Sequence, residues 1–244
     1  MNEAELEIES LKDLKNIIEE AEKWKIKLVL IGGYAVRAYT KGHRFTKDID
    51  LATTREALGN LKALLKFLGY SSRDTEFRVA GSKKFNEGFI DMHISVGSIF
   101  DMSTGLTYPV TDNLFFNAKK LKITGYHKAS EQHACMAPVV DLETLLVLKS
   151  IPTGRIKDTI DVLALLLDKG EEINPAVLIS RIPEEVGFRE HLVSQLRIYA
   201  DFVRKGEADK LWFNTTGSRL PSTEKRKILR LIRETVNTLK YSAQ

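Results

Sequence analysis

The sequence contains a single cysteine, Cys135, which excludes a disulfide within the chain. It has no apolar run near the roughly 20 residues that a membrane-spanning helix needs. Its first residues are acidic, whereas a signal peptide begins with basic and then apolar residues. Internal repeats and low-complexity segments are also lacking. These absences predict a soluble protein of the reducing cytoplasm that does not contact a membrane.

The composition is that of an ordinary globular protein, with 244 residues, 43% hydrophobic and 29% charged. This length suits one large domain or two small ones. The net charge is +4 and is unevenly spread, because the segment after residue 200 has ten Lys and Arg against five Asp and Glu. That basic segment is typical either of a phosphate-binding surface or of a solvated helix face.

The stretch from Leu28 to Leu51 has the most informative pattern in the chain. Residues 28–31 are apolar, with the length and β-branched content of a buried strand. Gly32 and Gly33 then break the strand, and residues 34–39 are suited to begin a helix. Paired glycines at such a turn let a phosphate approach the backbone, and the N–H groups of a helix start favour an anion. A pair of glycines alone also occurs in ordinary turns.

A basic loop follows the expected helix and leads into a second strand with two acidic residues. Asp48 and Asp50 alternate with Ile49 and Leu51, so both carboxylates project from the same face of the strand. Two carboxylates beside a phosphate cradle are what binding of Mg²⁺ with a nucleoside triphosphate requires. The order of strand, paired glycines, helix, basic loop and acidic strand is much rarer than any of its parts.

Residues 89–96 alternate strictly between apolar side chains on one face and Phe89, Asp91, His93 and Ser95 on the other. A carboxylate in the middle of a strand is costly unless it is solvated or binds a ligand. Asp91 is therefore either a surface residue of a half-exposed sheet or a third acid of the site. A histidine beside a carboxylate is more often a hydrogen-bonded neighbour than a substrate contact. The spacing of His127, His133 and Cys135 does not match a zinc site.

From Pro138 onward the apolar spacing is helical, with helices expected at 141–151, from 155 onward, at 186–204 and at 222–241. Helices at 5–24 and 54–68 are expected to accompany the first strands. Residues 97–126 contain short β-prone pieces, 114–116 and 121–123, which we expect to complete the sheet at its edge. The fold class is therefore α+β, with an α/β domain at 1–135 followed by a helical domain at 136–244.

These motifs resemble those of the nucleotidyltransferase superfamily of the DNA polymerase beta type. In that superfamily a glycine followed by Gly or Ser precedes two acids separated by one apolar residue, and a third acid lies on a neighbouring strand. The similarity extends to the toxin nucleotidyltransferases of type IV toxin–antitoxin systems, whose pattern Arg44, Thr46, Asp48 and Asp50 match. Their later motifs, a lysine on one helix and an acidic start to the next, are matched more weakly by Lys149 and by the segment 155–161.

The resemblance implies transfer of a nucleoside monophosphate from an NTP to an acceptor hydroxyl, with release of pyrophosphate. By the same resemblance, Asp48, Asp50 and Asp91 hold Mg²⁺ or Mn²⁺, and with Lys149 they form the catalytic set. The helical domain is expected to close the active-site cleft. The nucleotide contacts implied are Gly32, Gly33, Arg44, Thr46, Lys149 and Asp158. Gly33 stands where many members have Ser, so no hydroxyl contacts the phosphate there.

The acceptor is not determined by the sequence. Members of the superfamily modify tRNA ends, proteins or small antibiotics, and the basic segment after residue 200 favours RNA. An antitoxin or partner subunit is a further expectation of the resemblance. The alternative from another class is a non-catalytic nucleotide- or RNA-binding module on the same fold. A complete set of three mutually repelling acids argues against that alternative.

Overall fold

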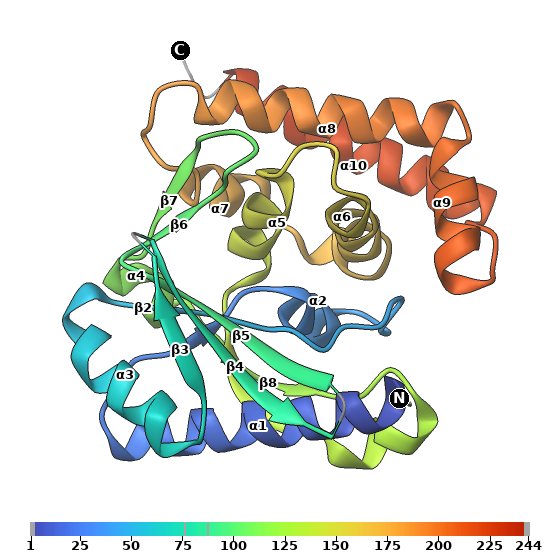
Figure 1. Ribbon diagram of the computed structural model, residues 1–244. Helices are drawn as coiled ribbons and strands as arrows, with labels where there is room; N and C mark the ends of the chain where they lie inside the picture. Colours follow the sequence, from blue (N-terminus) through green and yellow to red (C-terminus); the bar gives the residue numbers. More distant parts are fainter. Residues whose placement is uncertain (1–2, 76, 87, 242–244) are drawn as a thin grey trace. The chain divides into compact units, whose positions relative to one another are not determined.

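The computed structural model describes residues 3–75, 77–86 and 88–241. The chain forms two compact units, which are described separately (Figure 1). The sheet unit comprises residues 1–38, 45–100 and 107–141, and the helical unit comprises residues 39–44, 101–106 and 142–244. The α+β class expected from the sequence is confirmed. The boundary expected at 135/136 falls within the last strand of the sheet, and two short loops of the N-terminal half belong to the helical unit.

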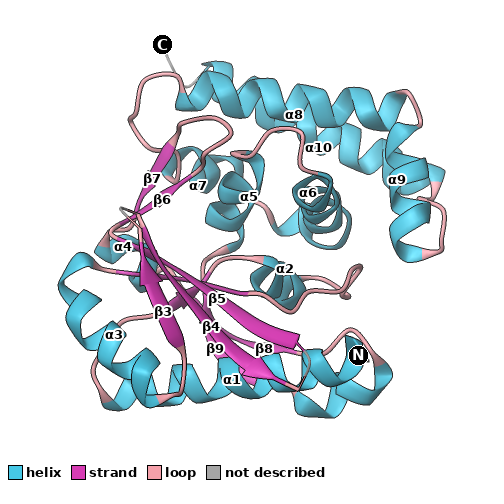
Figure 2. Ribbon diagram, in the orientation of Figure 1, coloured by secondary structure: helices cyan, strands magenta, loops and turns pink. Residues whose placement is uncertain are grey.

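The sheet unit is built on a mixed seven-stranded sheet with the order β3-β4-β5-β2-β1-β9-β8. Figure 2 draws the strands in magenta. Its strands are β1 (Val29–Leu30), β2 (Ile49–Thr53), β3 (Ser71–Asp74), β4 (Arg78–Phe85), β5 (Gly88–Val96), β8 (Lys119–Ile123) and β9 (Cys135–Val139). Strand β2 runs parallel to β5 and antiparallel to β1, and β1 runs parallel to β9. The two acidic strands expected from the sequence are therefore direct neighbours.

Helix α1 (Glu3–Lys23) lies along one face of this sheet and contacts β5, β9 and α3 (Leu58–Phe67) (Figure 1). Apolar residues at helical spacing, including Leu11, Leu14 and Ile17, are fully buried beneath the sheet. Trp24, the last residue of the helix expected from the sequence, lies just beyond α1, is 37% exposed and packs against Phe67. The buried face of β5 supplies the other half of this core, with the apolar side chains of residues 90, 92, 94 and 96.

The connections of the sheet unit differ in part from the sequence expectations. Residues 114–116, expected as β structure, belong to the short helix α4 (Asp112–Phe116), whereas 121–123 lie in the edge strand β8 as expected. Strands β6 (Ser98–Phe100) and β7 (Thr107–Pro109) pair with each other in a separate ribbon. The remaining elements are α2 (Gly33–Tyr39) and the 3-10 turns η1 (Arg55–Ala57) and η2 (Lys128–His133).

The helical unit confirms the expectation that the C-terminal part of the chain is helical. Its elements are α5 (Leu142–Ser150), α6 (Ile156–Lys169), η3 (Gly170–Glu172), α7 (Pro175–Ser180), α8 (Phe188–Arg204), α9 (Glu207–Thr216) and α10 (Ser222–Tyr241). The long helices α8 and α10 pack side by side, and α5 packs on α6 (Figure 1). No helix in the described ranges is long and apolar enough to cross a membrane.

Candidate active site

The turn after β1 brings the paired glycines against the first residues of β2. The backbone N–H of Ile31 donates to the carbonyl oxygen of Asp50 at 3.0 Å, which continues the pairing of β1 with β2. Helix α2 starts at Gly33, and the carbonyl oxygen of Gly32 accepts the N–H groups of Ala35 and Val36. The strand, glycine turn and helix expected from the sequence are therefore present, and both glycines are buried.

Gly32 leaves the space that the Asp50 side chain fills. A Cβ atom built on residue 32 would lie 1.8 Å from Oδ2 of Asp50 and 2.4 Å from its Cβ. Real atoms never approach so closely, so any side chain at position 32 would displace the aspartate. The sequence pattern suggested that this glycine admits a phosphate, and the structure adds that it admits a carboxylate of the neighbouring strand.

Asp50 lies opposite His93 in the register of the parallel β2–β5 pair. The Oδ1 atom of Asp50 is 3.4 Å from Nδ1 of His93, and the side chains are 33% and 38% exposed. The hydrogen bond that His93 donates to the carboxylate of Asp50 holds the pKa of His93 above its ordinary value, although burial acts in the opposite direction. The carboxylate that His93 contacts is therefore that of Asp50 on the neighbouring strand.

Asp91 projects from the same face of β5 as His93, because the residues of this strand alternate between buried and partly exposed. Its Oδ1 atom accepts the hydroxyl of Ser82 on β4 at 2.9 Å, and its Oδ2 atom is 3.8 Å from Nζ of Lys47. The side chain is 37% exposed. The alternation inferred from the sequence is confirmed, and Asp91 occurs on the strand next to that of Asp50.

Thr46, Lys47 and Asp48 lie in the loop that enters β2, and all three are partly exposed. Asp48 directly precedes the first strand residue, Ile49. Because β2 and β5 are parallel and Ile49 is level with Met92, the position of Asp48 corresponds to the level of Asp91. The structure thus places the three predicted acids in the same unit, with Asp48 and Asp50 at the start of β2 and Asp91 within the adjacent strand β5.

The fit of these acids to a divalent cation rests on their open arrangement. Among the described residues, no three His, Cys, Asp or Glu side chains lie close enough together to hold a metal ion. Mg²⁺ commonly takes one or two protein carboxylates and completes its coordination with waters and substrate phosphates. Partly exposed carboxylates are donors of this kind. The acids therefore fit a metal that binds together with a nucleotide, and they do not form a dedicated metal cage.

Lys149 lies at the centre of a buried ion network in the helical unit. Its Nζ atom is 3.0 Å from Oδ1 of Asp158 and 2.8 Å from Oδ2 of Asp161, and its side chain is 12% exposed. Burial alone would lower the pKa of Lys149, but the attraction of the two carboxylates outweighs it and raises the pKa. The lysine therefore stays charged in the folded protein.

Arg44 binds the same network from the loop 39–44, which belongs to the helical unit. Its Nε and Nη2 atoms donate to the two carboxylate oxygens of Asp161 at 2.6 and 2.7 Å. Burial raises the pKa of Asp161, but Lys149 and Arg44 together bring the pKa below its ordinary value. Lys157 lies four residues before Asp161 on α6, which is the spacing of an ordinary helix ion pair. Asp161 is instead 1% exposed and is shared by two cations from other elements.

The same loop is fixed at a second point on α6. Asp168 accepts the backbone N–H of Lys41 at 2.7 Å and lies 2.8 Å from Nε2 of His43, whose ring also contacts Trp212. Asp161 and Asp168 are seven residues apart and lie on one face of the helix. The loop that follows α2 is thus held by two acids of α6 within the helical unit.

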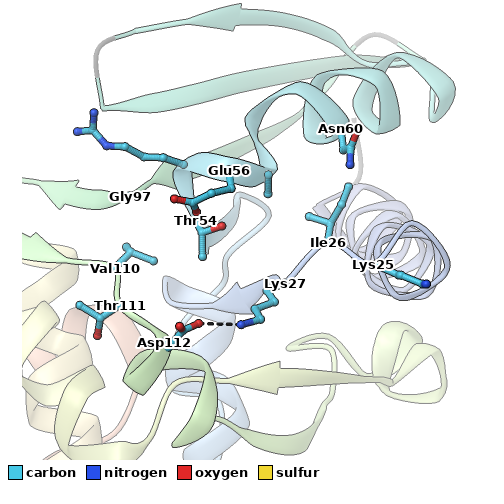
Figure 3. Close-up of a pocket in the computed structure, with 12 residues that line it drawn as sticks. Lys25, Ile26, Lys27, Thr54, Glu56, Asn60, Gly97, Val110, Thr111 and Asp112 are labelled. Carbon is cyan, nitrogen blue, oxygen red and sulfur yellow. Dashed lines mark hydrogen bonds and ion pairs between the residues drawn. The ribbon is translucent and has the colours of Figure 1, made fainter.

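A separate pocket of about 640 Å³ lies in the sheet unit beyond the far end of β2 (Figure 3). Thr54, Lys27 and Asp112 are among its lining residues, and Lys27 is bound to Asp112 at 2.7 Å. Its lining contains both basic and acidic side chains and none of the three predicted acids. Because Asp48 and Asp50 lie at the opposite end of β2, this pocket is distinct from the candidate active site.

Comparison with known proteins shows a family match along most of the chain. The family model described as "Nucleotidyl transferase AbiEii toxin, Type IV TA system" matches residues 17–229. Among solved structures, the chain is similar to JHP933 from Helicobacter pylori, with 13% identity, a TM-score of 0.51, and coverage of 95% of this chain and 92% of that one. At this identity the similarity shows the fold alone.

Two further solved structures share lower similarity. The lincomycin-bound lincosamide antibiotic adenylyltransferase LnuA has 20% identity and a TM-score of 0.43, and the match covers 63% of this chain and 94% of that chain. An antigenic nucleotidyltransferase-like protein from Paracoccidioides brasiliensis has 14% identity and a TM-score of 0.43, with coverage of 85% and 94%. No sequence among curated proteins matches this chain.

Proposed function

Because this chain belongs to the AbiEii nucleotidyl transferase family of type IV toxin–antitoxin systems, we propose that it transfers a nucleoside monophosphate from an NTP to a hydroxyl group of RNA, with tRNA as the acceptor. The observation that carries the proposal is the set of three acids beside the Gly32 turn, two at the start of β2 and the third within the adjacent parallel strand β5. An antitoxin is the partner protein that the family implies.

In the proposed reaction, the acceptor oxygen forms a bond to the α-phosphorus of the NTP, and the bond from that phosphorus to the β-phosphate oxygen breaks. Pyrophosphate leaves, and the proton of the acceptor hydroxyl passes to the carboxylate of Asp91. Asp48, Asp50 and Asp91 would hold Mg²⁺ or Mn²⁺, which neutralises triphosphate charge when it is bound. We propose Gly32, Gly33, Arg44, Thr46, Lys149 and Asp158 as the residues that position the nucleotide.

RNA is favoured as the acceptor by charge on the helical unit. Arg226 and Arg233 on α10 are exposed, and within the described ranges neither has an acidic partner. Unpaired cations on an exposed helix can bind the phosphate groups of RNA. A small-molecule acceptor needs only a pocket and would not use these cations. The other three basic residues of this helix face, Lys225, Lys227 and Arg230, have acidic neighbours at Asp209, Glu171 and Glu234.

The test is to incubate the protein with each α-labelled NTP and Mg²⁺, with and without total tRNA, and to measure labelled RNA and pyrophosphate. We expect labelled tRNA from the wild type and a loss of several orders of magnitude in Asp50→Asn, which keeps the side-chain shape but removes its charge. Asp74→Asn is the matched control, because Asp74 is an exposed acid on β3 that pairs with Lys62. Pyrophosphate release without labelled RNA would exclude RNA as the acceptor, and no release with any NTP would refute the proposed function.

A further inference from the structure

Helix α1 buries three polar side chains in a row, Glu7, Ser10 and Asp13. They are spaced three residues apart, and their exposed fractions are 0%, 0% and 6%. Burial of a carboxylate or hydroxyl is costly unless each polar atom has a partner. Apolar periodicity identifies the buried face of this helix but not the partners of its three polar residues, which only the structure shows.

Glu7 binds the helix that follows the glycine turn. Its carboxylate accepts Arg37 of α2, the hydroxyl of Ser130 at 2.5 Å, and the backbone N–H groups of Tyr126 and His127 at 2.9 and 3.1 Å. The Arg37 side chain is 2% exposed. Since α2 begins at Gly33 and Arg37 lies one turn later, this buried pair fixes the helix directly behind the Gly32 turn.

Ser10 binds the segment that enters the acidic strand. Its hydroxyl donates to the carbonyl oxygen of Lys47 at 2.5 Å, and Lys47 directly precedes Asp48. The ammonium group of Lys47 also donates to the carbonyl oxygen of Phe89 on β5 at 3.2 Å. One hydroxyl of α1 therefore holds the residue that connects the starts of the two acidic strands.

Asp13 has a different set of partners. It accepts the hydroxyl of Tyr70 at 2.8 Å and the ammonium group of Lys83 on β4 at 2.9 Å. Both partners lie outside residues 31–50, so Asp13 stabilises the sheet unit without binding the turn or the acidic loop. Asp13 is thus a natural control for Glu7 and Ser10, because it lies on the same face of the same helix and is similarly buried.

We propose that Ser10 and Glu7 are positioning residues of the nucleotidyltransferase site, acting through the carbonyl of Lys47 and through Arg37 to hold Asp48, Asp50 and the Gly32 turn in one arrangement. The inference rests on the proposed function, because it takes these acids as the reacting centre. Its physical basis is that the loop 45–48 has no regular secondary structure of its own, so the Ser10 hydrogen bond supplies order that the strand pairing does not.

The test compares Ser10→Ala, Glu7→Gln and Asp13→Asn in the full-length protein. Hydrogen–deuterium exchange should rise over residues 46–50 in Ser10→Ala and over residues 33–39 in Glu7→Gln, but over 70–84 in Asp13→Asn. In the transfer assay, Ser10→Ala should lower kcat about ten-fold, with the KM for NTP nearly unchanged, and should raise the Mg²⁺ concentration at half-saturation. Asp13→Asn should lower the melting temperature and leave kcat and the Mg²⁺ dependence near the wild-type values.

Unchanged exchange over residues 46–50 in Ser10→Ala would overturn the inference, as would a kcat and a Mg²⁺ dependence equal to those of the wild type. Equal losses of kcat in Ser10→Ala and Asp13→Asn would also overturn it, because a general loss of stability would then explain both. A wild-type protein that transfers nothing would refute the proposed function instead, and the exchange result would still decide whether Ser10 orders the entry to β2. Ser10→Ala removes only one hydroxyl, so it keeps the test decisive if Glu7→Gln fails to fold.

Discussion

The carboxylate of Asp50 occupies the place where a side chain on residue 32 would begin, so Gly32 and Asp50 fit together only as this pair. Gly32 follows Ile31, whose backbone N–H donates to the carbonyl oxygen of Asp50 on β2. The glycine therefore lies where the pairing of β1 with β2 ends. The turn and the acid are therefore one structural feature formed by two motifs that are far apart in the sequence.

The first prediction is that Gly32→Ala displaces Asp50 and lowers nucleotidyl transfer by about 100-fold or more, the loss expected when a reacting group moves by about 1 Å. Transfer of labelled NTP and the melting temperature should both be measured. The clash involves the Cβ of Asp50 as well as its carboxylate, so rotation of the side chain alone cannot relieve it.

Gly59→Ala is the control for this substitution. Gly59 lies in α3, and a Cβ atom there would meet nothing within 4 Å. Because alanine favours helix by about 1 kcal/mol over glycine, this variant should be as stable as the wild type or more stable, with normal transfer. Normal transfer in Gly32→Ala would show that the close fit to Asp50 has no role in the reaction.

The local pattern of this sheet was predictable, because it depends on neighbours in the sequence. The apolar residues 28–31 gave β1, and the alternation of 89–96 correctly assigned Asp91 and His93 to one face of β5. The partner of Arg44 was not predictable, since Asp161 is 117 residues away. Periodicity shows that a side chain points inward, but it does not show which group from another element meets it. For the same reason, the burial of Glu7 and Ser10 was missed.

The second prediction concerns the buried network around Lys149. Replacing it by Met leaves Asp158 and Asp161 buried with fewer cations, and we expect a loss of about 3–5 kcal/mol in the free energy of unfolding. Urea unfolding measures this loss. In the double variant Lys149→Met/Asp158→Asn the second substitution removes one of the two buried negative charges and should recover part of the stability. If Lys149→Met unfolds at the same urea concentration as the wild type, the network does not stabilise the helical unit.

The third prediction is a pH dependence due to Asp161, whose pKa is lowered in the folded protein. Its ionised form contributes full stability above the unfolded pKa of about 3.8, and this contribution is lost as the pH falls through the lower folded pKa. The difference in melting temperature between wild type and Asp161→Asn should therefore shrink from about pH 5 to pH 2.

Asp201→Asn provides the comparison for this pH series. Asp201 pairs with Arg204 on the surface of α8, and both side chains are 57% exposed. Surface ion pairs contribute little to stability, so the melting temperature of Asp201→Asn should stay close to that of the wild type over the whole pH series. A constant difference for Asp161→Asn would mean that its pKa is the same in the folded and unfolded states.

The last prediction separates the basic residues of α10 by their partners. Arg226 and Arg233 are exposed, whereas the ammonium groups of Lys225 and Lys227 pair with Asp209 and Glu171. If α10 binds RNA, neutralising the two arginines to Gln should weaken tRNA binding and reduce the salt slope by about 2, since each phosphate contact contributes about one unit. The Lys225→Gln/Lys227→Gln variant removes the same charge but only cations that are already paired, so its slope should stay near that of the wild type. Equal slopes in both double variants and the wild type would show that α10 is a solvated face, and the RNA surface would then have to lie elsewhere on the protein.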